Sequence, residues 1–285
     1  MPQRLGTIPQ DHGSATPRIK PAREGKNQPV PDEIRVESWA ELHERLFEGS
    51  WNEELGRFRS DLAFRGLEDA EHGLETSLSR LGEGNEELET HLLRNFRKYA
   101  RRDAVPVDAE WDWLALAKHH GLPTRVLDWS YSPYVALHFA TADHLGFKRD
   151  GAVWAVDYVR AHEELPEPLR EVLDDEGGNV FTAEMLARVA DGLGALEALA
   201  DEPFLVFFEP PSLDDRIVNQ YALFSLLSKA TTRLEEWLAD RPGLGRRIVV
   251  PAELKWEVRD KLDQANVTER VLFPGLDGID RKSVV

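Results

Sequence analysis

Short apolar segments of strand type recur along the chain between helical segments, and this pattern constrains the fold more than any other feature. Strand character is clearest at residues 62–66, 151–157, 204–208 and 246–250, which are rich in apolar, β-branched or aromatic residues. Helical periodicity or capping signals mark residues 38–47, 85–99, 108–120, 133–144 and 254–262. We therefore predict an α+β fold in which a mixed central sheet is flanked by helices.

The composition excludes several classes of protein. The chain has 285 residues and no cysteine, so it can form neither a disulfide nor a zinc–thiolate site. No apolar run is long enough to cross a bilayer, and the N-terminus lacks the apolar stretch of a secretory signal. A formal net charge of -17 argues against nucleic acid as a partner, because phosphate binding depends on a basic surface. We expect a cytoplasmic protein without membrane association; the charge still permits a local basic cleft.

The N-terminal residues differ in character from the rest of the chain. The first 30 contain five prolines and no aromatic residue, too little apolar surface for a packed core. We predict a flexible arm at 1–32, either a plain tail or a segment that docks a partner, followed by one domain at 33–285. Within that domain, residues 160–202 are acidic and mainly helical with several Gly and Pro breaks. They indicate a peripheral helical insertion.

Polar and aromatic residues converge between positions 119 and 133, at the ends of predicted elements. His119 and His120 end a helix that Gly121 can close, and the helix dipole there favours a positive charge. They either cap and pack that helix end or contact an anionic ligand. We predict a strand at residues 124–127 that enters a loop at Trp129 and Tyr131. Those two rings either stack on a planar base or cover the core.

Arg125 and Asp128 lie three residues apart around the end of this predicted strand. They either pair with each other and order the loop, or Arg125 and Thr124 contact a phosphate or ribose while Asp128 holds the geometry. Arg65 is a second candidate, because a charge drawn into a core by its apolar neighbours needs a partner. That partner is either a carboxylate of the protein or a ligand phosphate.

Other familiar arrangements are missing from the sequence. It has no phosphate-binding loop, no dinucleotide-binding Gly-x-Gly-x-x-Gly, no nucleophile elbow and no His-Glu-x-x-His pair. Its nine histidines do not cluster with carboxylates at metal-ligand spacing, so we predict no metal site. Arg216 and Gln220 lie on an apolar segment of strand character, where residues four apart share a face.

Several motifs resemble the FRG-domain family. They are Phe64–Gly66 (FRG), residues 74–80 (LETSLSR), residues 119–140 (HHGLPTRVLDWSYSPYVALHFA), Arg216 with Gln220 and Leu223–Phe224, and residues 272–278 (LFPGLDG). Together they span roughly residues 38–280. Lys118 stands where the family usually has Gln, His120 where it has an aromatic residue, and Ser130 where it prefers Thr.

The resemblance implies an ADP-ribosyltransferase-like fold and a protein of bacterial defence or toxin systems that uses or cleaves NAD. By analogy with such folds, Arg65, Thr124 and Gln220 are the catalytic positions. The expected NAD-binding residues are Arg65, Gly66, His119, Arg125, Asp128, Trp129 and Tyr131. Because Gln220 cannot supply the carboxylate that normally stabilises an oxocarbenium ion, Asp128 or Glu209 would supply it instead.

Two other functions remain open from the sequence. A non-catalytic module that senses a nucleotide or binds a protein partner would fit Gln220 and the lack of a decisive acid/base pair. A nuclease is disfavoured by the net charge and by the lack of metal-binding carboxylate spacing. A nucleotide ligand is thus the main expected partner, and a protein partner the second.

Overall fold

A computed structural model describes residues 32–82, 84, 86–100, 109–143, 146–212 and 215–275, apart from the side chain of Glu86. The predicted arm up to residue 31, the predicted helix-capping positions Asn85 and Asp108, and the closing residues from 276 onward lie outside the described residues.

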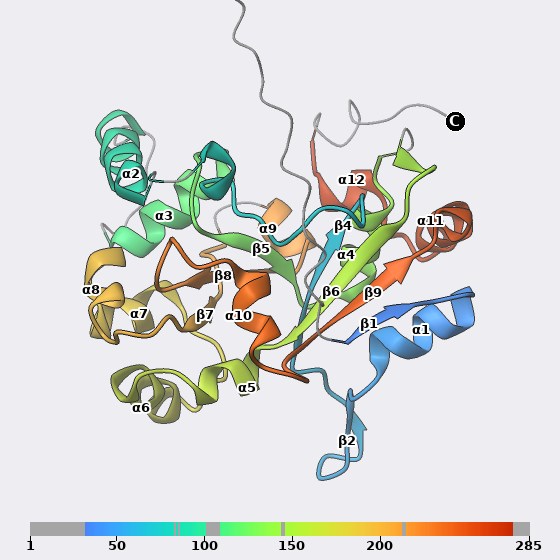
Figure 1. Ribbon diagram of the computed structural model, residues 1–285, viewed down its shortest axis with the longest axis horizontal. Coiled ribbons are helices and arrows are strands. Elements are labelled where there is room, and N and C mark those ends of the chain that lie inside the picture. The colour runs from blue at the N-terminus through green and yellow to red at the C-terminus, as the bar shows by residue number, and fades with distance from the viewer. Residues whose placement is uncertain are drawn as a thin grey trace, which may run out of the picture.

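Seven strands form one mixed sheet in the order β1-β9-β6-β4-β5-β8-β7 (Figure 1). They are β1 (Glu33–Arg35), β4 (Leu62–Leu67), β5 (Leu127–Ser130), β6 (Gly151–Asp157), β7 (Leu205–Phe208), β8 (Ala222–Leu227) and β9 (Gly245–Val250). The pairing of β1 with β9 is parallel, and the other pairings in this sheet are antiparallel. Two short strands, β2 (Trp51–Asn52) and β3 (Arg57–Phe58), form a separate hairpin.

Helices surround the sheet, so the predicted α+β fold with a mixed central sheet is confirmed (Figure 1). They are α1 (Trp39–Phe47), α2 (Glu86–Ala100), α3 (Glu110–His119), α4 (Pro133–Ala140), α5 (Tyr158–Glu163), α6 (Glu167–Glu176), α7 (Ala183–Val189), α8 (Leu193–Glu197), α9 (Asp215–Asn219), α10 (Leu234–Ala239), α11 (Lys255–Gln264) and α12 (Glu269–Leu272). Among the described residues, none of these helices combines the length and apolar character needed to cross a membrane.

The two faces of the sheet are covered by different helices. Directly paired residues share a face, and alternate residues of a strand share one too. Phe64 pairs with Ser130, and Asp128 pairs with Phe224, so all four lie on one face. That face packs against α1, α4 and α11 at one end and α3, α6 and α7 at the other. The opposite face, which includes Trp129, packs against α5 and α10.

Helix α4 packs directly against the backbone of β4 and β6 at two glycines. A Cβ atom on Gly66 would lie 1.8 Å from the carbonyl oxygen of Ala136, and one on Gly151 would lie 2.8 Å from that of Ala140. Any side chain at Gly66 would push α4 away from the sheet. Helix α4 is shorter than predicted and ends at Ala140, where the Thr141 hydroxyl donates back to the Leu137 carbonyl at 2.9 Å.

The strand predicted at residues 124–127 is wrong in position, because β5 begins only at Leu127. The preceding backbone bonds to other groups. The Thr124 carbonyl accepts from the Leu78 N–H at 3.1 Å, and the Arg125 N–H donates to the Glu89 carboxylate at 2.7 Å. Since these groups are satisfied by a loop and a side chain, they cannot join the sheet ladder. Trp129 therefore lies in a strand rather than a loop.

The expected strand at Arg216 and Gln220 is also wrong. Residues 215–219 form the short helix α9, in which Ile217 is buried and Val218 is 57% exposed. Tyr221 follows with a positive φ of 50°, and β8 starts after it. Such a backbone conformation does not continue a strand, so the two side chains do not share a pleated face.

Residues 160–202 are helical as predicted but not peripheral. Leu169, Phe181, Leu186 and Leu196 are fully buried within one large apolar cluster that includes β7 and β8. Phe181 also forms a parallel bridge with Phe208 of β7. The acidic residues of this segment hide its apolar spacing in the sequence, although that spacing determines its burial.

Candidate functional site

The sheet separates between β4 and β5, and Arg65 lies at this separation. The two strands share only the register pair Phe64–Ser130, whereas β4 pairs with β6 over its whole length. Arg65 Nη1 donates to the main-chain carbonyl of Asp128 at 2.6 Å and lies 3.8 Å from the Asp128 carboxylate. A guanidinium thus bridges the two strands where their backbone pairing stops.

Asp128 is shared between two cations. Its carboxylate accepts a hydrogen bond from Lys118 Nζ at 2.6 Å, in addition to the longer contact with Arg65. Partial burial alone would raise the pKa of the Asp128 carboxyl, but the charges of Lys118, Arg65 and Arg216 outweigh it and hold that pKa below its usual value. The carboxylate is therefore ionised at neutral pH, and its side chain stays 54% exposed.

Arg65 has unused capacity to bind an anion. Burial lowers the pKa of its guanidinium, the Asp128 carboxylate partly reverses this effect, and the charge of Arg80 lowers the pKa further. Its Nε is buried and has no hydrogen-bond partner among the described residues. An arginine remains protonated at neutral pH under such conditions. Two cations and one carboxylate in contact leave a positive balance that favours a negatively charged ligand.

Arg125 has a different environment from Arg65. Its Nε donates to the fully buried Glu89 carboxylate at 2.6 Å, and its Nη1 donates to the Ser228 carbonyl at 2.8 Å. Glu197 adds a second carboxylate at 3.7 Å. Arg125 therefore pairs with Glu89 and not with Asp128, and it fastens α2 to the loop before β5. The expected pairing of Arg125 with Asp128 is therefore wrong, because Glu89 takes the place of Asp128 as its partner.

Thr124 and Gln220 are likewise engaged in structural bonds. Thr124 is fully buried, and its hydroxyl accepts from the Val126 N–H at 3.3 Å. Gln220 Nε2 donates to the Leu272 carbonyl at 3.0 Å, which holds α12 against the end of α9. The Gln220 carbonyl accepts from the Ser130 hydroxyl at 2.8 Å. Arg65 and Asp128 meet, whereas Thr124 and Gln220 each bond to other parts of the fold.

Three other residues were predicted to bind NAD: His119, Trp129 and Gly66. His119, at the end of α3, has its ring 5.3 Å from that of His120. Trp129 is buried and donates to the Ser225 hydroxyl at 2.7 Å, so it packs in the core. The space beside Gly66 is filled by the backbone of α4.

Tyr131 belongs to an aromatic group just beyond the end of β5. Its ring lies 5.3 Å from Tyr221 and 5.9 Å from Tyr158, and its hydroxyl donates to Glu209 at 2.9 Å. Burial, followed by the Glu209 carboxylate, raises the pKa of Tyr131. Burial, with Asp61 as the next cause, raises the pKa of Tyr158 to about 12. Both hydroxyls therefore stay protonated at neutral pH, and that of Tyr131 is a hydrogen-bond donor.

Comparison with known families supports the motif assignment. The model of the FRG domain matches residues 60–149. Residues 60–149 of this chain are thus identified as an FRG domain. The comparisons found no curated protein and no solved structure that matches it.

The FRG match runs from just before β4 to just after α4 and includes Arg65, Lys118 and Asp128. The structure gives a physical role to each residue of the tripeptide that names the domain. Phe64 is buried beneath α4, Arg65 bridges to β5, and Gly66 allows α4 to approach.

Sequence reasoning missed two residues of the FRG site. Lys118 was noted only as a departure from the family pattern, yet it lies closer to the Asp128 carboxylate than Arg65 does, at 2.6 Å against 3.8 Å. The helical spacing of Leu88, Leu92, Phe96 and Tyr99 in the sequence favours burial of those side chains, yet Tyr99 is 76% exposed. Glu89 instead lies on the buried side of α2 with Leu93. An acidic residue four positions before a buried leucine was the available signal, since a buried carboxylate requires a cation.

Proposed function

We propose that this FRG-domain protein binds NAD at the separation between β4 and β5 and either cleaves it or transfers its ADP-ribosyl group, as an effector of a bacterial defence or toxin system. The observation that carries the proposal is the Arg65–Asp128–Lys118 cluster at a break in the central sheet. Arg65 and Lys118 would neutralise the pyrophosphate, which binds well to a guanidinium. The resemblance of the motif order to ADP-ribosyltransferases supports NAD as the substrate, as an analogy at fold level.

In this proposal the Asp128 carboxylate has a different role from the two cations that bind the pyrophosphate. Cleavage breaks the bond between the ribose carbon C1 and the nicotinamide nitrogen, and the electron pair leaves with nicotinamide. The ribose then carries a positive charge until water or an acceptor nucleophile adds to it. The low pKa of Asp128 keeps a carboxylate ready to stabilise that charge without a proton transfer. Asp128 takes the role that Gln220 cannot fill, because the Gln220 amide is neutral and holds α12.

An assay of nicotinamide release tests this proposal. The full chain is incubated with NAD, and free nicotinamide is measured by chromatography beside Asp128→Asn and Glu209→Gln. We expect Asp128→Asn to lower the rate by about a hundredfold or more, the usual loss when one electrostatic stabiliser is removed. Glu209→Gln, which removes the other nearby carboxylate considered for this role, should keep most of the rate. Loss in Glu209→Gln with none in Asp128→Asn would transfer the catalytic role to the tyrosine group.

A second function, nucleotide sensing without turnover, is supported by a specific observation. Thr124 and Gln220 are both committed to structural hydrogen bonds. If the chain binds NAD and no nicotinamide appears from any preparation, including one mixed with a protein acceptor, sensing replaces catalysis as the function. Absence of NAD binding would reject both functions together.

A further inference from the structure

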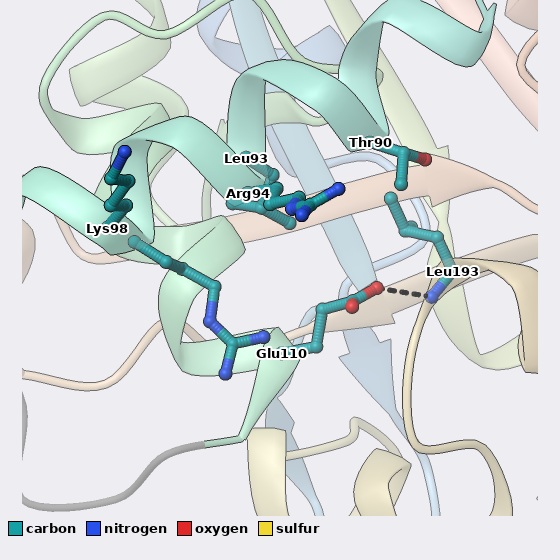
Figure 2. Close-up of a pocket in the computed structure, with 7 residues that line it drawn as sticks. Thr90, Leu93, Arg94, Lys98, Glu110 and Leu193 are labelled. Atoms are coloured by element: carbon teal, nitrogen blue, oxygen red, sulfur yellow. Dashed lines mark hydrogen bonds between the residues drawn. The ribbon is translucent and has the colours of Figure 1, made fainter.

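A pocket lies between α2, α3 and α8, away from the Arg65 cluster, and its wall is rich in cations. Its volume is about 480 Å³, within the usual range for small-molecule sites. The lining residues are Thr90, Leu93, Arg94, Arg97, Lys98, Glu110 and Leu193. Figure 2 shows Thr90, Arg94 and Lys98 on α2, with Arg94 extending toward Thr90 and the Lys98 side chain pointing away from the hydrogen-bonded Glu110 and Leu193. Three of the seven are basic, in a protein whose formal net charge is -17.

Two of the basic residues that line the pocket, Arg94 and Lys98, are available for a ligand. Arg94 and Lys98 are exposed, and neither forms an ion pair with a carboxylate among the described residues. They lie one helical turn apart, about 5–6 Å between Cβ atoms. The Arg97 guanidinium lies 5.7 Å from the centre of the Trp113 ring, which positions it beside the pocket. Such spacing along one helix suits a chain of linked phosphates better than one phosphate.

Glu110, the acidic residue among the described residues that line the pocket, does not cancel this positive charge, because it has a structural partner. Glu110 Oε1 accepts from the Leu193 N–H at 2.9 Å. A Cβ atom at Gly192 would lie 2.4 Å from the same oxygen, so a side chain there would displace the Glu110 carboxylate. Glu110 thus fixes the start of α8 and makes one pocket wall rigid. Leu93 and Leu193, which are buried members of the core, form the apolar part of the pocket lining.

We propose that this pocket is a second ligand site that binds an organic polyphosphate of nucleotide size, such as a nucleoside triphosphate. Arg94 and Lys98 contact neighbouring phosphoryl groups, and the two leucines contact the nucleoside. This site is separate from the proposed NAD site at the sheet, and the two sites have no residue in common. It does share α3 with the Arg65 cluster, since Glu110 opens that helix and Lys118 lies near its end.

Isothermal titration calorimetry of the full chain tests the pocket. The probes are ATP, AMP, inorganic tripolyphosphate and orthophosphate, and the key variant is the double substitution Arg94→Gln/Lys98→Gln. We expect ATP and tripolyphosphate to bind more tightly than AMP and orthophosphate, and the double variant to weaken ATP by about tenfold or more. A matched control, Arg57→Gln/Lys148→Gln, removes the same charge from exposed residues elsewhere and should bind ATP like wild type.

The controls separate this proposal from NAD binding. Arg65→Gln should not reproduce the tenfold loss of ATP affinity expected for Arg94→Gln/Lys98→Gln, because Arg65 lies outside the pocket. If the matched control loses as much ATP affinity as Arg94→Gln/Lys98→Gln, the loss comes from the change in net charge. The pocket would then not be the ATP site. Loss of ATP binding in Arg65→Gln with none in Arg94→Gln/Lys98→Gln would place the triphosphate at the sheet instead. Binding of a short single-stranded oligonucleotide in preference to ATP would replace the small ligand with nucleic acid.

Discussion

Two arginines of the matched FRG region have opposite surroundings. Arg125 is 7% exposed and is bonded to Glu89 and Ser228, with Glu197 nearby, so its charge is fully matched. Arg65 is 17% exposed, bonds to a main-chain carbonyl, and shares the half-exposed Asp128 with Lys118.

The difference shows how one residue type takes a structural or a binding role. A buried ion pair with every donor satisfied has nothing left to offer a ligand, and its loss leaves an uncompensated charge. A cation that shares one carboxylate with another cation gains more from an incoming anion. From the sequence, both arginines were candidates for phosphate binding. Their partners distinguish them.

The largest effect is expected at the Arg125 pair. Glu89→Gln should lower the free energy of unfolding by roughly 3 kcal/mol or more, because it leaves the buried Arg125 charge without its partner. Urea denaturation followed by circular dichroism measures the loss. The double variant Glu89→Leu/Arg125→Met removes both charges and should recover much of the stability. A loss below about 1 kcal/mol in Glu89→Gln would mean that the pair resembles a surface ion pair.

A smaller loss of stability is expected at Arg65. Arg65→Gln removes a charged donor to the Asp128 carbonyl at a partly open position, so the free energy of unfolding should fall by roughly 1–2 kcal/mol. The variant should stay folded and lose most of its NAD affinity. If Arg65→Gln destabilises the protein as much as Glu89→Gln does, Arg65 is a structural residue and the contrast between the two arginines disappears.

The sequence correctly predicted features of the fold that depend on neighbouring residues in the chain. Ser38 and Pro133 mark where α1 and α4 begin, and the apolar run of residues 151–157 is β6 as the structure has it. These features depend on neighbours in the chain. Helix α9 was missed because five residues give too short a pattern to distinguish a helix from a strand.

The partners of the site residues lay beyond the reach of local patterns. Glu89 is 36 residues from Arg125, and Leu272 is 52 from Gln220. Only the pairing of distant segments decides which carboxylate meets which arginine. The FRG motif named Arg65 and Asp128 as candidates, but the separation of β4 from β5 that brings them together is a property of the sheet.

The pH dependence of stability should report on Asp128. Its pKa is lower in the folded protein than in the unfolded chain, where it is about 3.9. Its stabilising contribution is therefore present above about pH 4 and is lost as the pH falls through the folded-state pKa. The stability difference between wild type and Asp128→Asn should be constant from pH 7 to 5 and shrink below about pH 4. A difference that grows on acidification would contradict the low pKa.

The smallest effect on stability is expected at Lys118. Lys118→Gln restores the residue usual in the family and should change the free energy of unfolding by less than about 1 kcal/mol, because Asp128 is half exposed. The pKa of Asp128 should rise, since its nearest positive charge is gone. Carboxyl NMR titration measures that rise, with Lys148→Gln as an exposed control. An unchanged pKa would assign the effect on Asp128 to Arg65 and Arg216.

A thermal-shift titration with NAD compares the two arginines most directly. NAD at a hundredfold excess over its Kd should raise the melting temperature of the wild type by about 5 °C. Arg125→Gln should melt much lower than wild type yet keep this shift at temperatures where it is folded, whereas Arg65→Gln should melt near wild type and lose it. The opposite pattern, a shift kept in Arg65→Gln and lost in a folded Arg125→Gln, would contradict the assignment of Arg65 as the binding residue and Arg125 as the structural one.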